Sequence, residues 1–333
     1  MQLRLQFQRN LVADEVSALT AIVCPILEGL LYGLKGQIVK ETVGSHDKVT
    51  LEVLARLYRP GDGDCGICFE YAVHDALNRK DPKVLERVQE ALTKHCGITG
   101  SETTSILFGV EKNSKGLQLI DTAKKRLTDE SVVLSGAKGR PAKLKKQLET
   151  IADAFYSEER QDCLPSSISG LWKADLFVGN TDSDAWVATT VKINSRRLTG
   201  APGLRIGIVP ADEGRKDVIT FDSSNNLVVC PLPYDQAFVE LFYQAWEIVS
   251  LFISADARLP KEQDLPRTVS RQVARRLDER RAYTVLDVIE TLRKLAQPEL
   301  LQTEQRPAAT AGVADALFRN VDTVLAPMPK QSP

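Results

Sequence analysis

The chain has 333 residues, of which 43% are hydrophobic and 26% are charged, so it can bury a full core and lacks the composition of a disordered chain. Lysine and arginine (43) nearly balance aspartate and glutamate (44), and the formal net charge of -1 excludes a protein that coats nucleic acid through its overall charge. Any contact with nucleic acid must be local.

The N-terminus has the pattern of a strand rather than of an export signal, because Leu3, Leu5 and Phe7 alternate with polar residues. The longest apolar stretch is interrupted by Pro25 and Glu28, which argues against a membrane span. Six cysteines are too few for a disulfide framework in a chain of this length. We therefore expect a cytoplasmic protein that has no contact with a membrane.

The first half of the chain is predicted to be mainly helical, because apolar residues recur at three- and four-residue spacing. The clearest helix has Asp81 as its N-cap, Pro82 at its first position and Gly97 after its end. We expect helices over 14–34, 50–58, 66–78, 82–96, 116–127 and 142–156, with one short strand over 105–110.

After residue 165 the pattern changes to short runs of β-branched and aromatic residues, separated by turn-forming clusters. The expected strands span 171–178, 186–193, 204–210, 218–221 and 227–232, and the last two suit a hairpin. Helices are expected over 234–253, 269–279, 284–295 and 312–325, the last within a frayed tail that follows residue 297. The predicted fold class is α/β, with a mixed central sheet flanked by helices.

One acidic residue, Asp175, lies inside an otherwise apolar predicted strand, where a carboxylate is costly unless a cation accompanies it. Alternation in the next strand places Ala188, Thr190 and Lys192 on one face. If the two strands form a hairpin, Asp175 and Lys192 converge at one edge of the sheet. The carboxylate of Glu70, beside the apolar stripe of helix 66–78, is a third candidate.

These residues resemble the PD-(D/E)XK nuclease superfamily, in which a helix bearing Glu precedes a strand bearing Asp, and the next strand bears an acid-x-Lys triplet. Here Glu70 opens a helix, Asp175 lies in a strand, and Thr190-Val191-Lys192 follows in the next strand. The resemblance covers these three short segments alone. It implies a restriction-endonuclease-like core with a large helical insertion.

The resemblance also implies roles for these residues. Asp175, Glu70 and the Val191 carbonyl would bind Mg²⁺ or Mn²⁺, and Lys192 would orient or activate the attacking water. The implied activity is Mg²⁺-dependent cleavage of DNA by an endonuclease, in a restriction or anti-phage defence system. Other subunits of such a system, or further copies of the chain, would be its partners.

Thr190 departs from the family pattern, because a hydroxyl stands where the family has an acid and binds a cation weakly. Either Glu70, Asp182 or Asp184 supplies the missing carboxylate, or the chain is a non-catalytic, nuclease-like interaction subunit of a defence complex. The plain structural alternative is an ion pair on a sheet beside a solvated helix residue.

The expected domain organisation follows from the resemblance. Residues 1–60 would form an N-terminal strand and helices, and residues 61–256 the nuclease-like core, with its helical insertion over 81–160. Residues 257–333 would form C-terminal helices and the frayed tail.

A basic segment surrounds the tripeptide Gly-Arg-Pro and resembles the AT-hook, which binds the minor groove of DNA. Its nucleic-acid-binding candidates are Lys138, Arg140, Lys143, Lys145 and Lys146. The alternative is the solvated start of a helix.

The cysteines suggest two other chemistries. Cys65 and Cys68, with His95 and Cys96, have the residue types of a zinc site, although they form a single C-x-x-C pair. Cys65 at a helix start could also be the nucleophile of a cysteine hydrolase, with His74 or His95 as its base.

Overall fold

The structure is a computed structural model of the chain. It describes residues 2–58, 64–108, 126–134, 141–155, 174–200, 203–211, 218–234 and 238–296; side chains are described from residue 15 onward, except for 151–155. The predicted helices over 116–127 and 312–325 lie outside these residues except for two positions at the end of the first. The helices are α1 (Gln2–Gly33), α2 (Gly36–Thr42), α3 (Leu51–Leu57), α4 (Asp64–Asn78), α5 (Pro82–Cys96), α8 (Leu144–Phe155), α11 (Val239–Ser254), α12 (Thr268–Asp278) and α13 (Val285–Leu295).

The described strands form one mixed sheet, which confirms the predicted α/β class. They are β1 (Thr103–Leu107), β2 (Val132–Leu134), β3 (Ala142–Lys143), β4 (Leu176–Asn180), β5 (Ala185–Val191), β6 (Arg205–Pro210), β7 (Thr220–Asp222) and β8 (Leu227–Leu232). The order is β1-β4-β5-β6-β8-β7, and β2 pairs with both β3 and β5. Strands β5, β6 and β8 are parallel, whereas β4–β5 and β7–β8 are antiparallel hairpins, as predicted.

Both faces of the sheet are buried around the β4–β5 hairpin, which explains why its strands are nearly continuous apolar runs. Leu176 and Val178 of β4 point into the larger core with α4 and α5, while Phe177 between them belongs to a second core. In that second core it packs with Trp186 of β5 and with Leu144 of α8.

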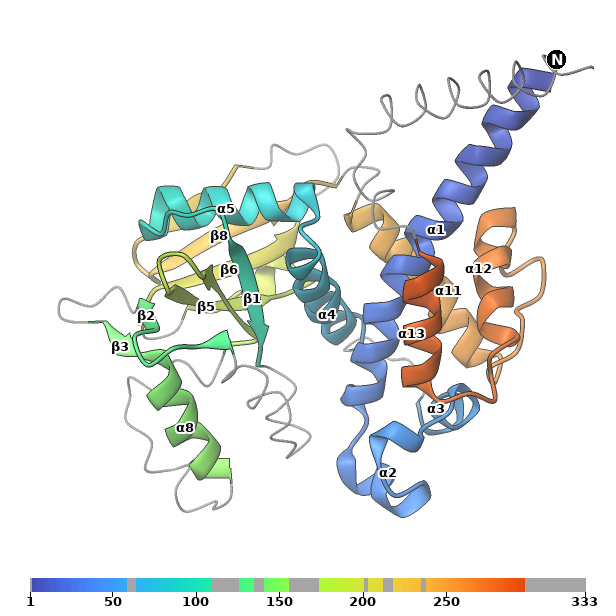
Figure 1. Cartoon of the computed structure of the whole chain (residues 1–333), viewed down its shortest axis with the longest axis horizontal. Coiled ribbons are helices and arrows are strands. Elements are labelled where there is room, and N and C mark those ends of the chain that lie inside the picture. Colours follow the sequence, from blue (N-terminus) through green and yellow to red (C-terminus); the bar gives the residue numbers. More distant parts are fainter. Residues whose placement is uncertain are drawn as a thin grey trace, which may run out of the picture.

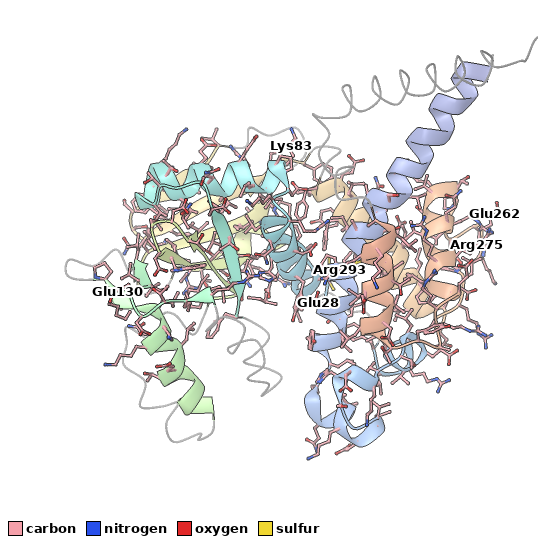
Figure 2. The ribbon with its side chains drawn as sticks, viewed as in Figure 1. Glu28, Lys83, Glu130, Glu262, Arg275 and Arg293 are labelled. Atoms are coloured by element: carbon pink, nitrogen blue, oxygen red, sulfur yellow. The ribbon has the colours of Figure 1, made fainter. Side chains whose placement is uncertain are left out.

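Helix α4 lies between the sheet and a group of helices formed by α1, α11, α12 and α13 (Figure 1). It contacts α1 on one side and strands β1 and β5 on the other. Arg293 of α13 joins Glu28 of α1 across that helical group, with an Nη2–Oε2 distance of 3.1 Å (Figure 2). Helix α4 is therefore held on two sides, which fixes the direction of any side chain that it presents to the sheet.

The segment Glu15–Gly33 of α1 is long and apolar enough to cross a membrane, but 83% of its most apolar window is buried in the protein. A core helix of a soluble protein has this character, and Leu19, Ile22, Ile26 and Leu30 are 0–1% exposed within the larger core.

The predicted N-terminal strand is wrong, because α1 begins at Gln2 and runs unbroken to Gly33. An alternation of three apolar residues is a weak signal, and leucine, glutamine and arginine are good helix formers. Once the buried part of α1 has formed, each further residue extends the helix at little cost. The strands β2 and β3 were not predicted, and the helix expected over 142–156 begins two residues later, at Leu144.

Candidate active site at the open end of the β4–β5 hairpin

Asp175 is held in place by its backbone, one residue before β4. Its N–H donates to the carbonyl of Thr189 in β5 at 2.9 Å, and its carbonyl accepts from the N–H of Phe108, which follows β1, at 2.9 Å. The ladder of hydrogen bonds therefore continues through Asp175 on both sides. The side chain of Asp175 is consequently aimed from a fixed point at the open end of the hairpin.

The carboxylate of Asp175 accepts hydrogen bonds from three consecutive residues at the end of the neighbouring strand. Its Oδ2 accepts hydrogen bonds from Thr190 Oγ1 at 2.8 Å, from the Val191 N–H at 2.9 Å and from Lys192 Nζ at 2.7 Å. The Asp175 side chain is 13% exposed. The cost of burying the charge is offset because an ammonium group and two neutral donors replace water.

Glu70 reaches the same ammonium group from helix α4. Its Oε1 lies 3.3 Å from Lys192 Nζ, although the two residues are 122 positions apart in the chain. Its neighbours Phe69 and Tyr71 are buried in the larger core, and Glu70 itself is 8% exposed. The structure thus brings Glu70, Asp175 and Lys192 together, while their catalytic roles stay a prediction.

Lys192 remains a cation in this setting. Burial acts to lower the pKa of its ammonium group, but the attraction of the Asp175 and Glu70 carboxylates outweighs burial and raises that pKa above its ordinary value. A lysine of this kind cannot act as a base at neutral pH. It can stabilise negative charge or orient a water molecule.

Arg205 is a second cation near Asp175 and was missed by the sequence reading. It opens β6 in register with Ala188 of β5 and is 3% exposed. Burial lowers the pKa of its guanidinium, against the attraction of Asp175, yet arginine remains charged at neutral pH. A lone arginine at the start of an apolar strand was a signal of the same kind as Asp175.

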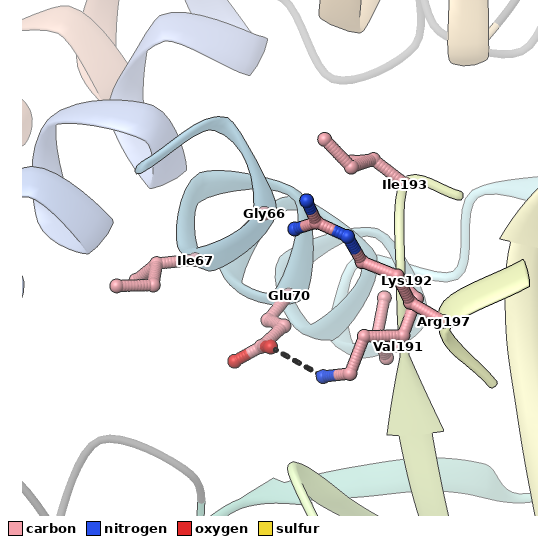
Figure 3. A pocket seen from close by; sticks show the side chains of 7 residues that line it. All are labelled: Gly66, Ile67, Glu70, Val191, Lys192, Ile193 and Arg197. Carbon is pink, nitrogen blue, oxygen red and sulfur yellow. Dashed lines mark hydrogen bonds and ion pairs between the residues drawn. The ribbon is translucent and has the colours of Figure 1, made fainter. Parts of the chain in front are cut away.

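Glu70 and Lys192 border a pocket of about 360 Å³ (Figure 3). Its other walls come from the first turns of α4, from the end of β5 and from the short 3-10 helix η2 (Ser195–Arg197). The residues that line it are Gly66, Ile67, Glu70, Val191, Lys192, Ile193 and Arg197. Sequence reasoning did not identify the contributions of Gly66, Ile67, Ile193 and Arg197.

The donor set here allows a magnesium ion but not a closed metal cage. Among the residues that the structure describes, no group of three or more His, Cys, Asp or Glu side chains could hold a metal ion. Mg²⁺ usually takes one or two carboxylates and keeps several waters. Glu70 and Asp175, which share one ammonium partner, fit that smaller requirement, and the ligand role of the Val191 carbonyl stays a prediction.

Asp182 and Asp184 cannot supply the missing carboxylate, because they lie at the turn of the hairpin, at the opposite end of β4 and β5. Asp182 accepts from the backbone and hydroxyl of Ser101, and Asp184 accepts from the hydroxyls of Thr128 and Ser131. These donors serve the fold. The strands between the two ends span about 15 Å at about 3.3 Å per residue.

The basic segment is also at the turn end of the hairpin. Lys143 pairs with Glu130 at 2.5 Å and Lys145 with Asp129 at 2.7 Å, while β2, which pairs with β3, contacts the first residues of β5. These ion pairs favour the solvated alternative for both lysines. Lys146 is exposed on α8, and the predicted contacts of residues 138 and 140 lie outside the described residues.

The geometry does not favour the cysteine chemistries. Burial raises the pKa of the Cys65 thiol to about 12, whereas a nucleophile needs a lowered pKa. Burial lowers the pKa of His74 to about 4, and that ring bonds to Ser105 Oγ at 2.9 Å. His95 stacks against Phe221. The absence of a metal-holding group among the described residues applies to the zinc candidates as well.

Comparison of the chain with protein-family models, with curated proteins and with solved structures finds no match. The geometry of Glu70, Asp175 and Lys192 is therefore the basis for assigning a function to this protein.

Proposed function

We propose that the protein is a Mg²⁺-dependent DNA endonuclease with a restriction-endonuclease-like core. The observation that carries the proposal is the meeting of two carboxylates and one ammonium group from helix α4 and the open end of the β4–β5 hairpin, with Nζ of Lys192 at 2.7 Å from Asp175 and 3.3 Å from Glu70. Phosphodiester cleavage requires a cation on the phosphate, an aligned water and positive charge against the developing negative charge. This set of side chains meets those requirements beside an open pocket.

Each residue has a distinct task in the proposed reaction. Asp175 and Glu70 would hold the metal ion, which would supply a Lewis acid and lower the pKa of a bound water. Lys192, being charged, stabilises the negative charge that builds on the phosphate. Thr190 and the Val191 amide orient Asp175 by donating to its Oδ2.

The setting belongs to the proposal as well and rests on family analogy. The protein would act on DNA in the cytoplasm, as part of a restriction or anti-phage system. Five cysteines of the described chain are free thiols, which suits a reducing compartment.

The test is nicking of supercoiled plasmid by the purified chain with Mg²⁺, beside the Lys192→Met variant. The matched control is Lys294→Met, which removes an exposed lysine that pairs with Glu290 in α13. We expect wild type and Lys294→Met to nick equally, and Lys192→Met to lose at least about 100-fold in rate. Equal nicking by all three proteins, or none by wild type, contradicts the proposal.

A second candidate is a non-catalytic, nuclease-like interaction subunit, and one observation favours it. Asp175 Oδ2 accepts from the Lys192 ammonium group and from Thr190, a threonine that stands where the family has an acid. An ammonium group that already neutralises the carboxylates lowers their affinity for a metal ion. Inert wild-type protein that shows no thermal stabilisation by Mg²⁺ or Mn²⁺ would support this candidate.

A further inference from the structure

We propose that Arg197 binds a phosphate group of the nucleic-acid backbone in the pocket beside Lys192. This inference rests on the proposed function, which supplies the class of ligand. It adds a binding residue that the nuclease resemblance does not include.

Of the two cations among the described residues that line the pocket, Arg197 is the one that no described carboxylate engages. Lys192 is already engaged by two carboxylates, Asp175 and Glu70. Glu70 is the one acid among the described residues that line the pocket, and Lys192 already engages it. No carboxylate of the described chain forms an ion pair with Arg197, so the guanidinium adds positive charge at the rim.

Arg197 lies in a short 3-10 turn that hydrogen bonds to Asn194 hold in place. In η2 the Arg197 N–H donates to the carbonyl of Asn194 at 2.9 Å, and the Asn194 side chain accepts from the Arg196 N–H at 2.9 Å. The next residue, Leu198, packs so closely on β6 that a Cβ added to Gly207 would lie 2.9 Å from its side chain. The segment that carries Arg197 is therefore anchored to the sheet through Leu198.

The direction and the space suit a bound phosphate. Figure 3 shows the Arg197 side chain extending from η2 across the pocket toward the first turn of α4. A Cβ added to Gly66, which lines the same pocket, would meet no atom within 4 Å. A planar guanidinium binds phosphate through two parallel hydrogen bonds.

Arg196 provides a matched control within the same turn. It precedes Arg197, is also exposed and carries the same charge, but it does not line the pocket. Substitutions Arg197→Gln and Arg196→Gln change the net charge equally. A difference between them therefore reports the pocket rather than the overall field of the protein.

The experiment measures binding of a fluorescent DNA duplex by anisotropy in EDTA, where metal-dependent cleavage cannot occur. We expect Arg197→Gln to weaken binding about tenfold and to lower the slope of log affinity against log salt by about one, while Arg196→Gln changes affinity less than about twofold. Competition with inorganic phosphate and with a mononucleotide distinguishes a backbone site from a site for a free nucleotide. We expect neither to displace the duplex at concentrations that an unlabelled duplex needs.

Equal affinities of the two variants, or no binding by wild type, overturns the inference, and so does displacement by the mononucleotide at duplex concentrations. Binding that depends on Arg197 in a protein that does not nick plasmid with Mg²⁺ removes the proposed function but leaves the phosphate site. If wild type nicks plasmid and the two arginine variants have equal nicking rates and DNA affinities, the proposed function stands and the phosphate site is removed.

Discussion

The two ends of the β4–β5 hairpin each hold a partly buried aspartate, but they surround it with different donors. At the turn end, Asp184 accepts from the hydroxyls of Thr128 and Ser131 and from the Trp186 indole N–H. At the open end, Asp175 accepts from a hydroxyl, a backbone amide and the Lys192 ammonium group. Both carboxylates are satisfied, as buried polar groups must be.

The difference lies in charge and access. Neutral donors around Asp184 tie the hairpin to the segment before β2, and nothing in that arrangement calls for a ligand. Lys192 bridges Asp175 to Glu70 and borders a pocket. A satisfied carboxylate is therefore informative about function only when its partner is a cation that also faces open space.

The largest expected contrast is between Asp175→Asn and Asp184→Asn. We expect Asp175→Asn to lower the plasmid-nicking rate at least about 100-fold, because the charge that holds the metal is lost. Asp184→Asn should leave nicking within about twofold, but lower the free energy of unfolding by about 1–3 kcal/mol as charge-assisted hydrogen bonds weaken. Nicking rates and urea unfolding measure the two effects. If both variants fold and lose nicking equally, the open end of the hairpin is no more important for activity than the turn end, which contradicts the proposed role of Asp175.

Adding an acid at each end should sharpen the comparison further. Thr190→Asp places a carboxylate beside Asp175. Because two like charges are then buried together, we expect the free energy of unfolding in EDTA to fall by about 1–3 kcal/mol. We also expect added Mg²⁺ to raise the Tm of this variant more than that of wild type. Ser183→Asp adds the same charge at the exposed turn, and its Tm should respond to Mg²⁺ as wild type does. Thermal unfolding with and without Mg²⁺ measures this change of Tm in the two variants and in wild type. A Thr190→Asp protein indifferent to Mg²⁺ would contradict the metal role.

A smaller effect is expected for the contribution of Asp184 to stability at acidic pH. Burial pushes the pKa of Asp184 upward, but hydrogen bonds from Ser131, Thr128 and Trp186 outweigh burial and hold that pKa below its ordinary value of 3.8. A lowered folded pKa stabilises the protein above the unfolded value and is lost as pH falls through the folded one. The difference in unfolding free energy between wild type and Asp184→Asn should therefore be constant from pH 7 to about pH 5 and shrink below about pH 4. A difference that grows in acid would reverse the sign and contradict the assignment.

The smallest effect is expected at the basic segment. Lys145→Met removes an ion pair with Asp129, whose side chain is 85% exposed, so the free energy of unfolding should change by less than about 0.5 kcal/mol. Duplex binding in EDTA should change less than about twofold, because Asp129 already neutralises the lysine and its segment is at the turn end. A tenfold loss of binding would instead support the minor-groove interpretation of this segment.

Several elements were predictable because their signals are local. The cap of α5 is confirmed, with Asp81 accepting from the Lys83 and Val84 amides and Gly97 adopting a left-handed conformation at φ 67°. The β7–β8 hairpin is also confirmed. Local signals failed at the N-terminus, where the helix continues through an alternating segment. They failed again at β2, whose partner β5 lies more than 50 residues further along the chain.

The sequence by itself determined the type of most long elements and pointed to Asp175, because a charge within an apolar strand must have a partner. Only the tertiary structure decided what that partner is. Lys192 meets both Asp175 and Glu70 because α4 is clamped between α1 and the sheet, and Arg197 lines the same pocket because η2 is anchored to β6. Propensities and caps act over a few residues, whereas the meeting of Glu70 with Lys192 depends on the packing of segments 122 residues apart.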